Sequence, residues 1–95
     1  MSNSERDKVA CHVYGSRRQE ALYVYLRTGL SPTDLPTALR ERTGALREVM
    51  TLELTPQRRL ARLDVNVVIR ALIDVGYYVQ LPPGDRVNAH LHFGD

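Results

Sequence analysis

Apolar and polar residues alternate in the first part of the chain at the period of a β-strand. Val9, Cys11 and Val13 recur at every second position, turn-forming residues occupy 15–18, and the alternation resumes over 21–26. Successive side chains of a strand point to opposite faces, so the second run divides into two sets. These are Leu22, Val24 and Leu26 on one face, and Tyr23 and Tyr25 on the other. Both sets are large enough to need cover, which predicts a hairpin that begins a sheet covered on both faces.

A short helix is predicted between Asp34 and Gly44. Asp34 can accept hydrogen bonds as its N-cap, and Pro36 fits the first turn, where a missing N–H costs little. Gly44 can end the helix. The side chains expected to point inward are Leu35, Ala38 and Leu39, and those expected to point outward are Arg40, Glu41 and Arg42.

Residues 46–54 alternate again and are predicted to form a strand. One face is expected to carry Leu46, Met50, Leu52 and Leu54. Glu48 breaks the pattern, because it falls on the apolar side.

The strongest helical pattern covers residues 65–73, with Asp64 as N-cap and Gly76 as a left-handed stop. Its apolar side chains recur at helical spacing: Val65, Val68, Ile69, Leu72 and Ile73. A strand follows over residues 77–81, and Pro82 and Pro83 end it because proline has no N–H to give to a ladder.

Length and composition fit one small globular domain. The chain has 95 residues, of which 43% are hydrophobic and 25% charged, so collagen-like, disulfide-scaffold and wholly disordered classes are excluded. Residues 1–8 are polar and are predicted to be a flexible tail, 9–83 the domain, and 84–95 a C-terminal extension that is either a short packed helix or a frayed tail. The predicted fold class is α+β, a small α/β sandwich with helices packed on a mainly antiparallel sheet.

Charge and cysteine content favour a cytoplasmic protein without dictating its partner. The formal net charge is only +2, from 13 basic and 11 acidic residues, and phosphate affinity depends on clustered cations rather than on a small surplus. No apolar run is long enough to span a membrane, and the polar first eight residues do not resemble a signal peptide. The lone thiol of Cys11 fits a reducing compartment.

Three separated strings of residues resemble the YcgL-domain family of small bacterial proteins. They are Cys11 to Tyr25 with Val13-Tyr14 and Tyr23-Val24-Tyr25, Asp34-Leu35-Pro36 with Leu39 and Gly44, and Leu60-Ala61-Arg62 through Asp64-Val65 to Gly76-Tyr77-Tyr78-Val79-Gln80-Leu81-Pro82-Pro83. The strings keep their order and spacing from Cys11 to Pro83. The resemblance implies a small α/β sandwich, in agreement with the patterns above, and implies no reaction, substrate or cofactor.

Catalytic and metal-binding patterns are weak in this sequence, so an enzyme is the less favoured class. The motifs GxGxxG, HExxH, GxSxG and CxxC do not occur. Cys11 and His12 are adjacent in a predicted strand and point to opposite faces, so Cys11 is interpreted as a small core residue. His90 and His92 would need a third ligand such as Asp95 or His12 and are interpreted as part of a solvated terminus. No metal or cofactor is predicted.

Arginines and tyrosines supply the candidate binding residues, because a guanidinium pairs with carboxylate or phosphate and a tyrosine offers a large face with a polar tip. The candidates are Arg17 and Arg18 at the hairpin tip, Arg58, Arg59 and Arg62 in the connector after the third strand, and Tyr23, Tyr25, Tyr77, Tyr78 and Gln80 on strands. The first hypothesis is a non-catalytic protein-binding module. The alternative is RNA binding by arginines and stacking tyrosines. The third is a small hydrolase that uses Glu20, Glu48 or Asp64.

Overall fold

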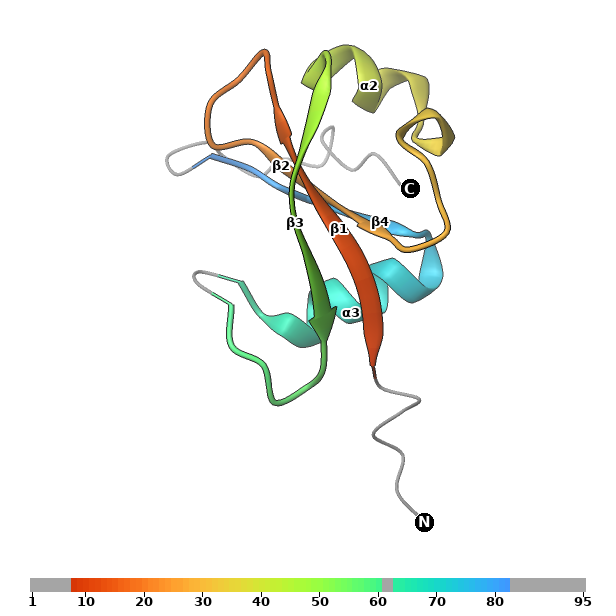
Figure 1. Ribbon diagram of the computed structural model, residues 1–95, viewed down its shortest axis with the longest axis vertical. Coiled ribbons are helices and arrows are strands. Elements are labelled where there is room, and N and C mark those ends of the chain that lie inside the picture. Colours follow the sequence, from red (N-terminus) through yellow and green to blue (C-terminus); the bar gives the residue numbers. More distant parts are fainter. Residues whose placement is uncertain (1–7, 61–62, 83–95) are drawn as a thin grey trace.

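The computed structural model describes residues 8–60 and 63–82, which form a four-stranded antiparallel sheet and two helices (Figure 1). The strands are β1 (Val9–Ser16), β2 (Tyr23–Arg27), β3 (Leu46–Leu54) and β4 (Tyr77–Gln80), in the order β3-β1-β2-β4. The helices are α2 (Thr37–Thr43) and α3 (Val65–Asp74), and a single 3-10 turn, η1 (Pro32–Asp34), precedes α2. The predicted α+β class and the N-terminal hairpin of β1 and β2 are confirmed.

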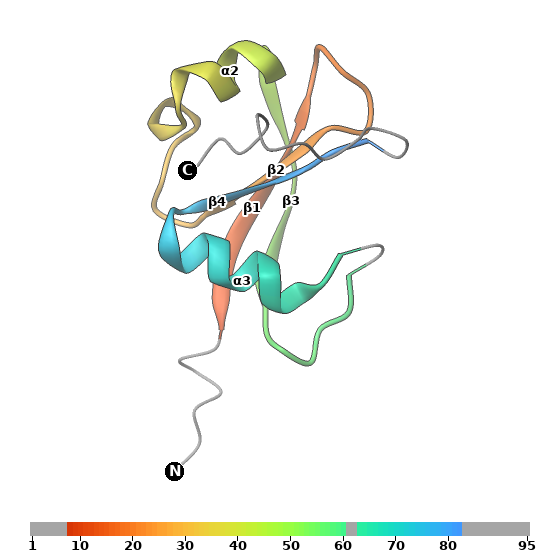
Figure 2. The same ribbon diagram turned by 180° about the vertical axis from the view of Figure 1, so that it is seen from behind.

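Each face of the sheet carries its own hydrophobic cluster, as the alternation in the hairpin predicted. The α2-side face packs Val24 and Leu26 of β2 against Leu39 of α2. The α3-side face packs Cys11 and Tyr25 together with α3. The two helices also lie toward opposite ends of the sheet, with α2 beside the hairpin tip and α3 beside the far end (Figures 1 and 2). The hairpin end of the α3-side face is therefore not covered by α3.

The amphipathic pattern correctly predicted α3 and its N-cap. The Asp64 carboxylate accepts a hydrogen bond from the Asn66 backbone N–H at 2.9 Å, and the buried stripe consists of Val65, Val68, Ile69 and Leu72. The inward placement of Ile73 was wrong, because its side chain is 51% exposed. Ile73 follows Leu72 by about 100° around the helix, which places it at the margin of the stripe.

The start and facing of α2 differ from the prediction. Asp34 does not cap α2; its carboxylate accepts from the Ser31 N–H at 2.7 Å and closes a capping box on η1. The helix begins at Thr37 without a side-chain cap. Its buried residues are Leu39 and Thr43, so Ala38 points outward, whereas Arg42 is half-buried.

A β-bulge explains why the apolar pattern of β3 was imperfect. The register pairs Val13 with Met50 but Tyr14 with Glu48, so β3 has one residue more than β1 between these two pairs. An inserted residue reverses which side chains share a face. As a result Leu46 packs on the α2-side face and Leu54 on the α3-side face. The prediction that both would share one face was wrong.

Candidate binding surface at the hairpin end

Four of the candidate side chains gather on the α3-side face through the β2–β4 register. Tyr25 pairs with Tyr78, and Tyr23 pairs with Gln80. The rings of Tyr25 and Tyr78 meet edge to face with centroids 6.3 Å apart, and the Tyr25 hydroxyl donates to Gln80 Oε1 at 3.0 Å. Burial, and then the neighbouring Cys11, Tyr78 and Tyr23, raise the pKa of Tyr25 above its usual value. Tyr25 is thus mainly a core residue, and Tyr77 lies on the opposite face.

The end of this face that α3 does not cover has an apolar floor at Gly15. Gly15 pairs with Tyr23 on one side and with Arg47 on the other. A Cβ at Gly15 would lie 3.4 Å from Val49 Cγ2 and 3.5 Å from Tyr23 Cε1, so both side chains already rest against this glycine. The Val49 side chain is 40% exposed, and that of the next residue, Met50, is 49% exposed. Such exposure of neighbouring large apolar side chains is typical of interaction surfaces.

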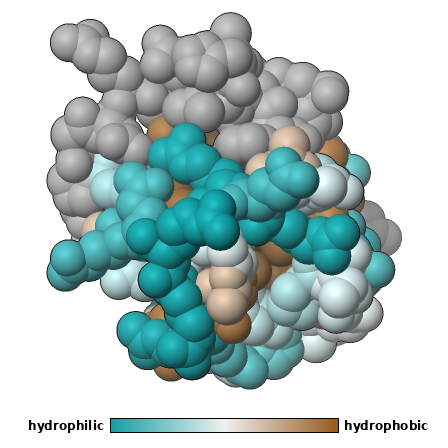
Figure 3. Space-filling model, turned by 90° about the horizontal axis from the view of Figure 1, so that it is seen from above, coloured by the Kyte–Doolittle hydropathy of each residue, from teal (hydrophilic) through white to brown (hydrophobic). Residues whose placement is uncertain are grey.

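A hollow of about 430 Å³ lies between the hairpin loop and this end of the sheet. Its lining consists of Gly15, Ser16, Arg17, Glu20, Ala21, Leu22, Tyr23 and Arg47. Seen from this end, hydrophilic side chains run across the molecule and hydrophobic atoms show between them (Figure 3). Ala21 holds a backbone φ of +66°, which L-residues rarely adopt.

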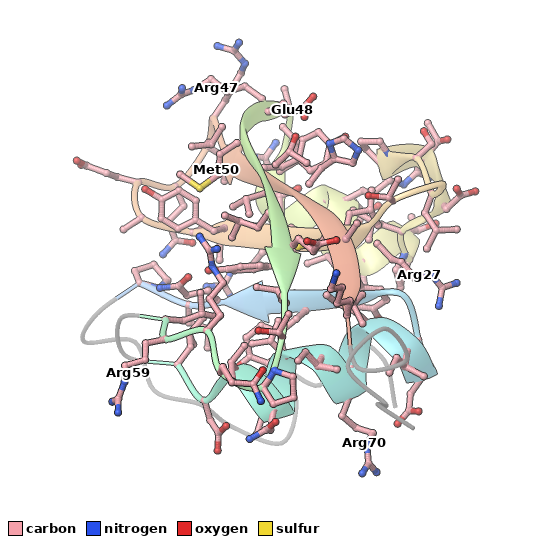
Figure 4. All side chains as sticks on the ribbon, turned by 60° about the horizontal axis from the view of Figure 1, so that its bottom comes forward. Arg27, Arg47, Glu48, Met50, Arg59 and Arg70 are labelled. Atoms are coloured by element: carbon pink, nitrogen blue, oxygen red, sulfur yellow. The ribbon has the colours of Figure 1, made fainter. Side chains whose placement is uncertain are left out.

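Two arginines of this hollow are neighbours: Arg17 directly follows β1, and Arg47 lies in β3. The Arg17 N–H donates to the Ala45 carbonyl at 2.9 Å, which places Arg17 diagonally across from Arg47. Neither guanidinium makes a hydrogen bond or an ion pair within residues 8–60 and 63–82. Arg47 and Met50 lie at the same end of β3, and Glu48 lies on the other side of that strand (Figure 4). Among the described residues, Glu20 is the one acidic side chain of the lining.

Other arginines stabilise the ends of the helices. Arg18 Nη1 donates to the Glu41 carbonyl at 2.5 Å, and the Arg18 side chain lies over Gly44 at the end of α2. Arg27 Nη1 donates to the Leu72 carbonyl at the end of α3, at 2.9 Å. Cations stabilise helix C-termini because the last carbonyls lack partners within the helix. The exposed Arg18 side chain therefore already has a hydrogen-bond partner at the end of α2.

Arg58 and Arg59 of the connector are not among the residues that line the hollow. Arg58 and Arg59 are exposed, and Arg59 points away from Arg47 (Figure 4). Arg62 lies outside the described residues. Burial raises the pKa of the Cys11 thiol to about 11, and the Arg58 charge lowers it by a smaller amount.

A second polar cluster occupies the α2-side face, where sequence reasoning assigned no site. His12 Nδ1 lies 2.7 Å from Glu48 Oε2, and Thr51 Oγ1 lies 3.3 Å from the same ring nitrogen. Burial and, secondly, the Glu48 charge raise the pKa of the Tyr14 hydroxyl. The acids named for a hydrolase are separated: Glu20 lines the hollow, Glu48 pairs with His12, and Asp64 caps α3.

Comparison with known proteins identifies the family. The model of the YcgL domain matches residues 11–83. The chain belongs to the YcgL-domain family. Named YcgL domain-containing proteins include one from Cellvibrio japonicus, 38% identical over 82 residues, which covers 86% of this chain and 84% of that protein. Another, from Pseudomonas aeruginosa strain LESB58, is 38% identical over 79 residues, or 83% of this chain and 81% of that protein. The resemblance seen in the sequence is thereby confirmed.

The YcgL-domain match begins inside β1 and ends three residues after β4, so it contains the whole candidate surface. Within the described residues no three His, Cys, Asp or Glu side chains are grouped to hold a metal ion, and His90 and His92 lie outside that part. No helix of the described segments is long and apolar enough to cross a membrane. Sequence reasoning missed Arg47, Val49 and Met50, because only the bulge and the register bring them beside Tyr23.

Proposed function

We propose that this YcgL-domain protein is a non-catalytic binding module that captures an acidic segment of another protein. The site is the hairpin-end surface, defined as Tyr23, Val49 and Met50 with the flanking Arg17 and Arg47. The observation that carries the proposal is the placement of two half-exposed apolar side chains near a tyrosine and two arginines that have no acidic partner among the described residues. Apolar contact area with an arginine rim is the usual composition of protein interfaces.

Charge complementarity decides the chemistry of the partner. Arg17 and Arg47 are diagonal neighbours that repel each other, and a carboxylate between them would relieve that repulsion while pairing with both. With Glu20 at the rim, the described lining residues leave a surplus of one positive charge in the hollow. The partner segment therefore carries carboxylates beside at least one apolar side chain.

RNA binding remains the alternative, with weaker support from the geometry. Stacking of bases needs exposed ring faces. Tyr25 is only 7% exposed and meets the Tyr78 ring edge to face, and Arg59 points away from Arg47 of the hollow. The expected cytoplasmic location rests on composition and stays a prediction.

Site-specific photo-crosslinking in the cells that make the protein tests the proposal. A photoreactive amino acid replaces Met50 in one variant and Ile73, which has nearly the same exposure at 51% against 49%, in the control. We expect a discrete protein adduct from position 50, none from position 73, and loss of the adduct when Arg47→Glu is added. Equal adducts from both positions, or an adduct at position 50 that ribonuclease removes, would contradict a protein-binding role for this surface.

A further inference from the structure

The open edge of β3 carries backbone groups whose direction follows from the ladder of β1. In an antiparallel sheet, alternate residues of a strand turn their N–H and C=O toward one neighbour and the residues between them toward the other. The Ser16 N–H donates to the Leu22 carbonyl at 2.9 Å, so even-numbered residues of β1 bond toward β2. The Arg17 N–H donates to Ala45, so odd-numbered residues bond toward β3.

The register carries this alternation onto β3 beyond the bulge. Val13 pairs with Met50 and Cys11 with Leu52, so Met50 and Leu52 bond inward to β1. The residues between and after them, Thr51 and Glu53, turn their N–H and C=O outward. β3 is the edge of the sheet, so these groups meet no other strand within the described segments.

The side chains along this edge differ between the two faces. On the α3-side face, Met50 is half-exposed, Leu52 is partly buried, and Arg47 follows beyond the bulge. On the α2-side face the edge carries Glu48 and Glu53. A neighbouring strand would thus meet apolar side chains and then a cation on one face, and carboxylates on the other.

We propose that the segment captured by this protein is an extended C-terminal tail, which adds to β3 as a fifth, antiparallel strand opposite Thr51 and Glu53. This inference rests on the proposed function and names its ligand. Antiparallel pairing matches every pair of the sheet and brings the C-terminal end of the added strand to Arg47 and Arg17. The tail has apolar residues on the α3-side face, uncharged polar residues opposite the two glutamates, and carboxylates at its end. The bulge stops the ladder after Met50.

Amide hydrogen exchange with a synthetic probe tests strand addition. The probe is an N-acetylated peptide of alternating threonine and valine that ends in Asp-Glu with a free carboxylate. When nine-tenths of the protein is bound, exchange of the Thr51 and Glu53 amides should slow about tenfold, because only the free fraction exchanges. The Leu52 amide, which already bonds to β1, should change little and serves as the internal control.

Two substitutions at one position separate the backbone from the side chain. Thr51→Pro removes an outward N–H, a place where an edge strand tolerates proline, and should abolish binding of the peptide. Thr51→Val keeps that N–H and should bind as the wild type does. Arg47→Glu should weaken binding about five- to tenfold, whereas Arg70→Glu on the outer side of α3 should not.

The outcomes distinguish this inference from the proposed function. Peptide-induced shifts at Met50 and Arg47 without protection of Thr51 and Glu53 would overturn strand addition and leave the binding surface in place. Absence of any shift at millimolar peptide would also overturn strand addition, and the crosslinking experiment alone would then judge the proposed function. Thr51→Pro that is folded but binds normally would overturn it as well.

Discussion

Two isoleucines one turn apart on α3 offer the sharpest test of the fold. Ile69 is 8% exposed and Ile73 51% exposed, although the sequence pattern predicted both to be buried. Replacing either with alanine removes the same three carbon atoms. The two variants therefore differ only in how much of the isoleucine the fold removes from water.

The magnitudes follow from burial. At about 0.8 kcal/mol per buried methylene, the transfer term is about 2.2 kcal/mol for Ile69→Ala and about 1.2 kcal/mol for Ile73→Ala. Ile69 also leaves a cavity, which brings its loss of unfolding free energy to about 2–4 kcal/mol. Ile73 leaves none, and alanine's higher helix propensity reduces its loss to about 0.5–1 kcal/mol.

Urea unfolding followed by circular dichroism measures both losses. We expect an unchanged m value and a urea midpoint that falls much further for Ile69→Ala than for Ile73→Ala. Equal midpoints for the two variants would refute the orientation of α3 on the sheet, and an Ile69→Ala loss below about 1 kcal/mol would refute the packing argument.

Three further predictions concern single residues. The Cys11 thiol has a pKa of about 11 in the fold against 9.0 normally, so the thiol of the unfolded chain loses its proton at lower pH. The free energy of unfolding should therefore fall between pH 9 and 11, and it should fall less in Cys11→Val. A free energy of unfolding that does not change over this pH range would contradict the burial of Cys11. Ala21→Gly should raise the free energy of unfolding by about 0.5–1 kcal/mol, because glycine adopts the observed φ of +66° without strain. A lower free energy of unfolding, measured with urea, would show that Ala21 is not strained. Arg27→Met should lower the free energy of unfolding by about 1 kcal/mol, because the Leu72 carbonyl loses its charged donor. An unchanged urea midpoint would show that this hydrogen bond contributes nothing to stability.

The sequence predicted what depends on strong local periodicity. The stripe of α3 was predicted because four buried residues recur at helical spacing, and the facing of Tyr23 and Tyr25 was predicted because strand alternation is strict there. The predicted start of α2 was wrong because the Asp34 carboxylate already accepts the Ser31 N–H in the capping box of η1, which ends before α2 begins.

The binding surface could be predicted only in part. Arg17 and Tyr23 were named, but nothing in the local pattern joins them to Arg47 and Met50. Their proximity depends on the pairing of β1 with β3 and on one extra residue near Val49, and both are long-range properties of the folded chain. Arg18 was named as a binding residue on its charge, whereas its side chain is held by the end of α2.

An amide-exchange map of this protein in complex with the protein crosslinked from position 50 tests whether the partner is recognised at the hairpin end of the α3-side face. Slower exchange is predicted over the outward amides of β3 and the hairpin loop of residues 16–22, with little change on the outer side of α3. Protection confined to α2 or to the outer side of α3 would contradict recognition at the hairpin end.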